Sequence, residues 1–371
     1  MIRVAVFNVE NLFDRARAIN TGNGTNGGRV LELFESLNRT FQKLVYTEAD
    51  KNSIRNGLVE LGLERSDTGP SVELRQNRGR LVRRPQQGGL EIMAKGRHDW
   101  IGWLELQREA VDETATRNTA RVIRDIAAHV LGVVEAEHRI SLKRFNENVL
   151  PAVDGSSYEE VMLIDGNDDR GIDVGLLVRP PVTIARMRSH VDDRYNGQRI
   201  FSRDCPEYEL VIDGGATVLV LVNHFKSKGY GMPAESNARR RQQARRVAEV
   251  YTARRSAGVD NIVVLGDLND TPDSDPLSPL LANTDLRDIS THPRFIGDSR
   301  PGTYRNGTAS DKIDYILLSP SLFARVSSAN VFRKGVWGGP HGTLWPIYPE
   351  MTVRQEAASD HAALWVDLNI V

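Results

Sequence analysis

The stretch Ile262-Val263-Val264-Leu265-Gly266-Asp267-Leu268-Asn269-Asp270 sets the expectation for the whole chain. Its four consecutive apolar residues are typical of a strand buried on both faces, as in an α/β core. A glycine that allows the backbone to turn comes next, and polar side chains follow it directly. Catalytic groups of layered α/β proteins often lie at such strand ends. The alternative is that Asp267 and Asn269 only shape a turn.

The composition sets broad limits on the protein. Its 371 residues, 40% of them hydrophobic, can bury a large core, and a formal net charge of −1 favours no class of partner. The single cysteine, Cys205, excludes a disulfide framework or a cysteine metal cluster within one chain. No apolar stretch is long enough to cross a bilayer, and Met1 runs into an apolar strand without a basic leader. We therefore expect a cytoplasmic protein.

Five further polar clusters lie at the ends of expected strands or interrupt them. The clusters are Asn8, Glu135, Asn223 with His224, Asp314, and Asp360 with His361. Carboxylates and amides without cysteine suit a hard divalent cation, Mg²⁺ or Mn²⁺. Two histidines, each with a carboxylate that can orient it, suit phosphate charge stabilisation or proton transfer.

These residues also have structural alternatives. Asn8 can shape a turn, Glu135 can form a salt bridge at the sheet rim, and a single histidine is more often structural than catalytic. In the expected strand 172–178, Asp173 interrupts an apolar run, which is costly unless the carboxylate is paired. Arg170 is the expected partner. Two alternatives stay open: the Arg170–Asp173 pair has a purely structural role, or it takes part in the site.

The rest of the chain supplies helices and one region with few strand signals. Apolar residues repeat at helical spacing over 30–45, 53–63, 111–128, 141–150 and 234–256. The segment 15–97 is expected to be an insertion into a single domain spanning 1–371. Its basic part, Arg65–Arg97, is expected to be a solvated, mobile loop. Most of the arginines of 234–256 are expected to form a solvated helix face.

The order and context of six motifs resemble the endonuclease/exonuclease/phosphatase superfamily. The motifs are Phe7-Asn8-Val9-Glu10-Asn11-Leu12-Phe13, Val133-Val134-Glu135, Asn223-His224-Phe225-Lys226-Ser227, Gly266-Asp267-Leu268-Asn269-Asp270, Lys312-Ile313-Asp314-Tyr315 and Ser359-Asp360-His361. Each motif is weak alone, but six in the family's order are strong together. The resemblance implies a four-layer α/β/β/α sandwich of two packed mixed sheets with helices on both outer faces.

The resemblance also implies hydrolysis of a phosphoester by activated water, with one or two Mg²⁺ ions. It makes Glu135 the main metal ligand, with Asn8 beside it and Asp360 binding or orienting a metal. It gives Asp267 the task of orienting or deprotonating the attacking water. Asn269 holds a phosphoryl oxygen.

Further implied roles concern the phosphate. Asp314 holds His361, whose imidazole stabilises the charge that develops on the phosphorus centre. His224 and Asn223 contact the phosphate. Arg170 is carried over as an additional polar residue of the site.

The substrate is open at this point. A nuclease acting on DNA or RNA is the leading prediction, because the helix arginines, the arginines of the insertion and Lys226 and Lys228 can follow a nucleic-acid backbone. The alternative enzyme is a phosphatase or phosphodiesterase for a small-molecule, inositol or lipid phosphoester. A catalytically inactive binding module is the third reading, and it conflicts with the chemically competent residues in all six clusters. No protein partner can be inferred.

Overall fold

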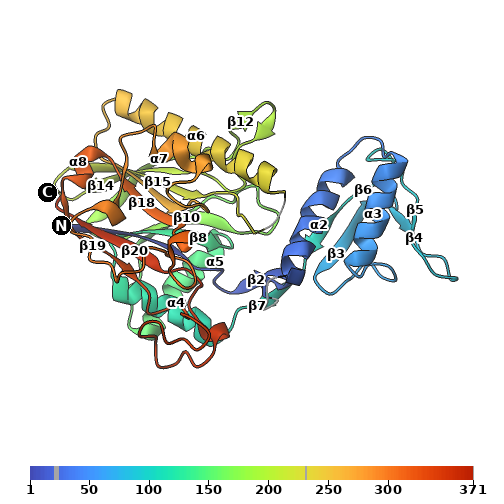
Figure 1. Cartoon of the computed structure of the whole chain (residues 1–371), viewed down its shortest axis with the longest axis horizontal. Helices are drawn as coiled ribbons and strands as arrows, with labels where there is room; N and C mark the ends of the chain where they lie inside the picture. The colour runs from blue at the N-terminus through green and yellow to red at the C-terminus, as the bar shows by residue number, and fades with distance from the viewer. Residues whose placement is uncertain (21–24, 230–231, 371) are drawn as a thin grey trace. The chain divides into compact units, whose positions relative to one another are not determined.

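The computed structural model describes residues 1–20, 25–229 and 232–370. The chain divides into two compact units (Figure 1). Unit 1 comprises Met1–Phe13, Val111–Lys228 and Met232–Val371, and unit 2 comprises Asp14–Ala110 with Gly229–Gly231. The insertion expected at 15–97 therefore falls inside unit 2.

Two six-stranded mixed sheets form the centre of unit 1 (Figure 1). The order in the first sheet is β19 (Val326–Phe332), β20 (Ala363–Leu368), β1 (Ile2–Asn8), β8 (Val130–Ala136), β10 (Asp173–Val178) and β9 (Glu160–Leu163). The order in the second is β11 (Val182–Arg188), β14 (Glu207–Ile212), β15 (Thr217–His224), β16 (Ile262–Asp267), β18 (Asp314–Leu318) and β17 (Arg287–Asp288). The pairs β1–β8 and β15–β16 are parallel, and the other pairs are antiparallel.

The two sheets pack face to face through the apolar side chains of their strands. Val263 and Leu265 of β16 belong to a core shared with strands of the first sheet, whereas Ile262 and Val264 belong to a core on the outer face. This division follows from the alternation of side chains along a strand. At Gly132 of β8, a Cβ atom would lie 2.4 Å from Leu265 Cδ1, so the two sheets approach closely at this position.

Helices cover both outer faces of this pair of sheets. Those on the first sheet are α4 (Glu113–Ile126), α5 (Arg139–Arg144) and the π-helix Phe145–Val149, and those on the second are α6 (Pro233–Ser256) and α7 (Ser278–Leu281). Helix α4 begins after Asp112, whose carboxylate accepts hydrogen bonds from the backbone N–H groups of Thr114 and Ala115. The order helix, sheet, sheet, helix confirms the predicted α/β/β/α sandwich.

Unit 2 has a hydrophobic core of its own. Its helices are α1 (Arg17–Asn20), α2 (Thr25–Phe41) and α3 (Glu48–Glu60), and its strands are β2 (Asp14–Ala16), β3 (Val72–Arg78), β4 (Val82–Arg83), β5 (Glu91–Ile92), β6 (Ile101–Leu106) and β7 (Arg108–Ala110). Helix α3 begins at a capping box formed by Thr47 and Asp50.

The prediction that Arg65–Arg97 is a solvated, mobile loop is wrong. Strand β3 in this stretch pairs with β6, and its residues Val72 and Leu74 are buried in the core of unit 2. Several arginines are held by carboxylates: Arg75 by Glu105, Arg83 by Glu91 and Arg84 by Asp67. The basic composition therefore reflects ion pairs on a folded sheet.

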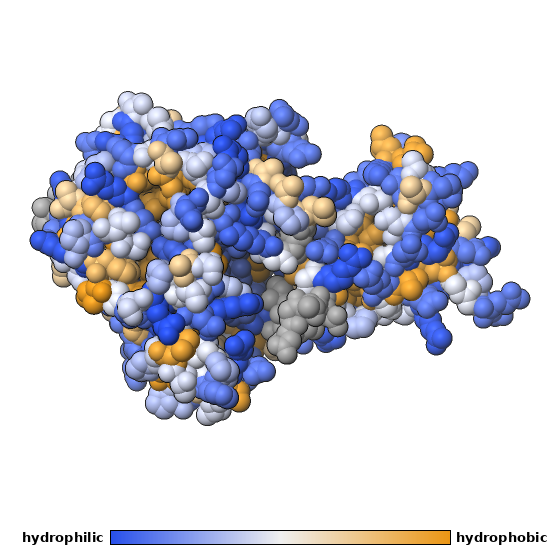
Figure 2. Space-filling view, in the orientation of Figure 1, coloured by the Kyte–Doolittle hydropathy of each residue, from blue (hydrophilic) through white to orange (hydrophobic). Residues whose placement is uncertain are grey.

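No helix in the described part of the chain is both long and apolar enough to span a membrane. On the face shown in Figure 2, hydrophobic side chains appear as groups interspersed with hydrophilic ones. The exposed large hydrophobic side chains of unit 2 are Leu44, Val45, Val59, Met93 and Trp103.

Candidate active site

The polar residues of the site lie where the central strands of the two sheets end. Asn223 pairs with Gly266 and His224 with Asp267 in the parallel register of β15 and β16, and Asp267 pairs with Asp314 of β18. Gly266 lies inside β16 instead of at a turn, with φ at 138°. A Cβ atom there would lie 1.9 Å from the carbonyl oxygen of Asn223. Glycine therefore permits the close strand pairing that aligns His224 with Asp267.

His361 and Asp314 form a close side-chain pair in the site. The Nδ1 atom of His361 lies 2.8 Å from a carboxylate oxygen of Asp314, and both residues are buried. Burial lowers the pKa of the imidazole, but the carboxylates of Asp314, Asp360 and Asp267 together raise it well above the usual value. The imidazole is therefore held in its charged form, with Nε2 directed to the centre of the site.

Asp267 lies between the two histidines. Its Oδ2 atom is 3.9 Å from His361 Nε2 and 3.7 Å from His224 Nε2, and it accepts a hydrogen bond of 3.3 Å from Asn8 Nδ2. Its Oδ1 atom accepts a hydrogen bond from the backbone N–H of Asn269 at 2.8 Å. Burial and the neighbouring carboxylate of Asp314 raise the pKa of Asp267, whereas the charge on His361 lowers it.

Glu135 joins this cluster through His224. Its Oε1 atom lies 3.4 Å from His224 Nε2, and Glu135 adopts a left-handed backbone conformation with φ at 66°. Such a conformation is costly for a non-glycine residue and often occurs at functional sites. Burial and the nearby charges of Arg203 and Arg170 lower the pKa of His224 well below the usual value, so this imidazole stays neutral.

The structure brings together most, but not all, of the predicted site residues. Asp360 is half-buried, and its Oδ1 atom lies 3.6 Å from His361 Nε2. Asn269 donates a hydrogen bond from its side chain to the carbonyl oxygen of Phe225 at 3.1 Å. Asn223 is different, because the alternation along β15 puts its side chain on the face of Leu221, opposite that of His224. Among the described residues, the Asn223 amide therefore donates to the carbonyl oxygen of Leu221, at 3.4 Å, and does not reach the other site residues.

The expected pair Arg170–Asp173 is replaced by another pairing. Arg170 donates two hydrogen bonds to Asp168, at 3.0 and 2.8 Å, and Arg203 lies 3.1 Å from the same carboxylate. Asp173 accepts a hydrogen bond from the backbone N–H of Gly166 at 2.8 Å. Burial and the neighbouring carboxylates raise the pKa of Asp173 to about 7. The strand geometry turns Asp173 toward a backbone donor, which sequence spacing alone does not reveal.

Two residues of the site were not singled out from the sequence. Thr303 Oγ1 accepts a hydrogen bond from the backbone N–H of Asp314 at 3.0 Å, and Thr303 O accepts one from the N–H of Ala362 at 2.6 Å. The ring of Tyr304 lies 4.8 Å from that of His361. The sequence indicates the segment 300–305 only as a rim segment that presents an aromatic residue, without a role in the site.

The donor set fits a divalent cation. Among the described residues, Asp267, Asp314 and His361 form a buried group whose ligand atoms lie within 4.8 Å of one another. Because a charged imidazole has no free lone pair, the carboxylates are the metal donors of this group. The oxygen donors of the site are those that Mg²⁺ or Mn²⁺ prefers. The pKa of Asp267 is raised first by burial and then by repulsion from the carboxylates of Asp314 and Glu135. A cation would relieve that repulsion.

The prediction of a solvated arginine face on α6 is wrong for Arg240, which is buried. Its guanidinium lies 3.1 Å from the carboxylate of Asp270 and donates a hydrogen bond to the carbonyl oxygen of Lys226. Further arginines of this helix are also ion-paired: Arg241 with Asp275, Arg246 with Asp193 and Arg254 with Glu207. These partners reduce the positive charge that the helix presents.

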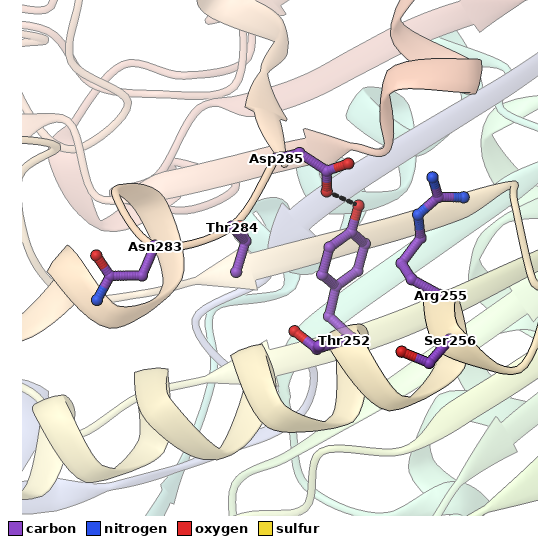
Figure 3. A pocket seen from close by; sticks show the side chains of 7 residues that line it. Thr252, Arg255, Ser256, Asn283, Thr284 and Asp285 are labelled. Carbon is purple, nitrogen blue, oxygen red and sulfur yellow. Dashed lines mark hydrogen bonds between the residues drawn. The ribbon is translucent and has the colours of Figure 1, made fainter.

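A surface pocket lies on α6, away from the polar residues of the candidate active site. It has a volume of about 410 Å³, and Figure 3 shows Thr252, Arg255, Asn283 and Asp285 around it. Tyr251 donates a hydrogen bond to Asp285 across it. None of the predicted site residues lines this pocket.

Comparisons with known proteins identify the family of this chain and support its fold. The model of the Endonuclease/Exonuclease/phosphatase family matches residues 107–361. A comparison with curated proteins finds no match. The chain is similar to the mannosyl-6-phosphatase of Bacteroides thetaiotaomicron, with a TM-score of 0.51 and 17% identity over 69% of this chain and 92% of that one. This similarity supports the shared fold.

Two further solved structures are more distant. An endonuclease/exonuclease/phosphatase from Bacteroides vulgatus has a TM-score of 0.49 and 16% identity over 69% of this chain and 91% of that one. The catalytic domain of human Nocturnin has a TM-score of 0.45 and 13% identity over 71% of this chain and 89% of that one.

Proposed function

Because the chain belongs to the endonuclease/exonuclease/phosphatase family, whose members are generally phosphoester hydrolases, we propose that it is a phosphodiesterase dependent on Mg²⁺ or Mn²⁺. One observation carries the proposal. The buried carboxylate of Asp267 lies within 4 Å of two imidazoles, one kept neutral and one kept charged by their surroundings. Pairs of titratable groups with opposed pKa shifts are typical of acid–base sites.

In this proposal, Asp267 orients or deprotonates the attacking water. The hydrogen bonds from Asn8 and the Asn269 N–H hold its carboxylate in one orientation. Asn269 presents its side-chain amide to a phosphoryl oxygen when substrate is bound. Its present hydrogen bond to the Phe225 carbonyl keeps the amide at the end of β16.

The charged imidazole of His361 stabilises negative charge on the phosphorus centre. Asp314 orients the ring through Nδ1 and keeps the proton on it, so that Nε2 faces the reaction. Fixed, preorganised charge of this kind is often the largest single contribution to catalysis. His224, being neutral, can contact the phosphate as a hydrogen-bond partner without adding charge.

Glu135, Asn8 and Asp360 would hold the metal, with Asp267 adjacent to them. When bound, a divalent metal polarises a phosphoryl oxygen and lowers the pKa of water. Asn223 and Arg170 act behind the site in this scheme. Arg170 and its partner Asp168 contribute to the electrostatic environment that keeps His224 neutral.

We also propose that unit 1 is a single catalytic domain and that unit 2 is inserted into it. Strand β1, which precedes unit 2, pairs with β8 and β20, which both follow it. Unit 1 thus needs chain from both sides of unit 2 to complete its first sheet.

Two substrate classes suit this site. DNA or RNA remains the leading prediction, and the exposed side chain of Arg305 supplies positive charge for it. A small-molecule, inositol or lipid phosphoester is the second class. It is supported by the carboxylate partners of Arg240, Arg241 and Arg246, which leave α6 poorly suited to follow a polyanion.

The test is hydrolysis of supercoiled plasmid, a labelled single strand and bis-p-nitrophenyl phosphate, with Mg²⁺, Mn²⁺ or EDTA. We expect metal-dependent turnover that His361→Ala and Asp267→Asn abolish, whereas Asp285→Asn, at the remote pocket, leaves it unchanged. Plasmid cleavage that weakens steeply with salt supports a nuclease. Turnover of the small diester alone supports the second class. If folded protein turns over none of these substrates with either metal, the proposal is wrong and a binding module is favoured.

A further inference from the structure

The segment Thr303–Arg305 connects the surface to the centre of the site. The ring of Tyr304 lies 4.8 Å from the ring of His361, and the guanidinium carbon of Arg305 lies 4.7 Å from the centre of the Tyr304 ring. The backbone N–H of Arg305 donates a hydrogen bond of 2.7 Å to the carbonyl oxygen of Asp360. The Tyr304 ring therefore lies between Arg305 and the imidazole of His361, which faces the scissile group.

The backbone of this segment is held in a costly conformation. Arg305 has φ at 46°, in the left-handed region that disfavours non-glycine residues. Hydrogen bonds from Gly307 N to Tyr304 O, at 2.9 Å, and from Gly302 N to Gly307 O, at 3.0 Å, close the turn around it. Such strain persists only where the surroundings determine the conformation, and it occurs often at ligand contacts. The turn and the tyrosine ring thus hold the arginine beside the site.

The charge of Arg305 is available to a ligand. Its side chain is exposed, and no carboxylate of the described residues forms an ion pair with its guanidinium. Other arginines of unit 1 differ in this respect: Arg240 pairs with Asp270, and Arg333 pairs with Asp298. A guanidinium fixed against an aromatic ring is well suited to bind phosphate through its planar donors.

We propose that Arg305 is a specificity-determining residue that binds a second phosphate of the substrate, next to the scissile phosphoester. The inference rests on the proposed function and narrows its substrate class. The favoured substrates are phosphoesters that carry a further phosphate group beside the bond that is broken. Tyr304 positions the arginine and also packs against His361. The second phosphate and the scissile phosphoester would therefore bind on either side of the same tyrosine ring.

Binding without turnover gives the first test. The affinities of thymidine 3′,5′-bisphosphate and thymidine 5′-monophosphate are measured by calorimetry in EDTA. Wild type should bind the bisphosphate roughly 10-fold or more tightly than the monophosphate, and Arg305→Gln should remove that preference. Glutamine leaves the backbone cost at this position unchanged, and Arg305→Lys should retain part of the preference. The matched control is Arg287→Gln, because Arg287 is also exposed and lies over an aromatic ring, that of Phe323.

Hydrolysis gives the second test. The ratio of kcat/KM for a dinucleotide with an added terminal phosphate to that for bis-p-nitrophenyl phosphate should fall roughly 10-fold in Arg305→Gln. Equal binding of the two ligands by wild type would overturn the inference, as would an equal loss on both esters. If the binding preference depends on Arg305 but no ester is hydrolysed with any metal, the anion site stands and the proposed function fails.

Discussion

The Nδ1 atom of His361 lies 2.8 Å from the carboxylate of Asp314, although the two residues come from segments of different sheets. Asp314 begins β18 of the second sheet, and His361 lies two residues before the start of β20 in the first. The contact thus bridges the two layers at the end where their central strands carry polar residues. Any change in how the sheets pack would alter this distance, so the dyad depends on the core as well as on its own side chains.

Asp314→Asn should lower activity without unfolding the protein. The variant keeps the shape of the side chain but loses the negative charge that raises the pKa of His361 and fixes its ring. We expect kcat for bis-p-nitrophenyl phosphate to fall about 10²- to 10⁴-fold, with a smaller change in KM. Asp285→Asn serves as the control, since Asp285 lies at the remote pocket. An unchanged kcat in Asp314→Asn would show that the dyad has no catalytic role.

Thr303→Val should weaken the site through the backbone of Asp314. The substitution removes the hydroxyl that accepts the Asp314 N–H and leaves a buried donor without its partner. We expect a loss of about 1–3 kcal/mol in the free energy of unfolding, measured by urea denaturation, and a fall in kcat smaller than that of Asp314→Asn. Thr303→Ser retains the acceptor and should behave much like wild type. Equal stability of the valine and serine variants would contradict this role.

Gly266→Ala should be far more destabilising than Gly258→Ala. Both glycines have positive φ, at 138° and 88°, so both substitutions incur backbone strain. At Gly266 the new Cβ would also lie 1.9 Å from the Asn223 carbonyl oxygen, whereas nothing lies within 4 Å at Gly258. We expect a loss on the order of 1–2 kcal/mol at Gly258 and a loss of more than about 4 kcal/mol, or failure to fold, at Gly266. Thermal melting of the pair would check this, and similar melting temperatures would refute it.

Asp173→Asn should change how stability depends on pH. The pKa of Asp173 is raised from an ordinary value to about 7, so the folded state prefers the protonated carboxyl. Wild type therefore loses stability as pH rises through the window from about 4 to 7, by up to about 4 kcal/mol. Asparagine cannot ionise and still accepts the Gly166 N–H, so the variant should gain in melting temperature relative to wild type above this window.

The neighbouring Asp168 provides the opposite case. Although burial raises its pKa, Arg170 and Arg203 lower it, so ionised Asp168 stabilises the fold at neutral pH. Asp168→Asn should accordingly lower the melting temperature at pH 7, with an effect that shrinks toward acid pH.

For the preceding variant, Asp173→Asn, a melting temperature that follows that of wild type across the whole pH range would refute the raised pKa of Asp173.

Part of the fold could be read directly from local pattern. Continuous apolar runs at 262–265 and 131–134 predicted the strands that the structure has at Ile262–Asp267 and Val130–Ala136. Helical spacing over 111–128 predicted the helix Glu113–Ile126, because these elements carry their own periodicity. The stretch Arg65–Arg97 misled the prediction, since its apolar residues are few and far apart. Its strand β3 becomes stable only by pairing with β6, about thirty residues later in the sequence.

The sequence by itself determined the family and the set of polar residues at the strand ends, because residue types in a fixed order are visible without coordinates. Only the tertiary structure decided which of them face one another. Because side chains alternate along β15, those of Asn223 and His224 lie on opposite faces of the strand. Arg170 donates hydrogen bonds to Asp168 instead of Asp173, which accepts one from a backbone N–H. Side-chain direction and long-range partners depend on register and packing, which arise only when distant segments meet.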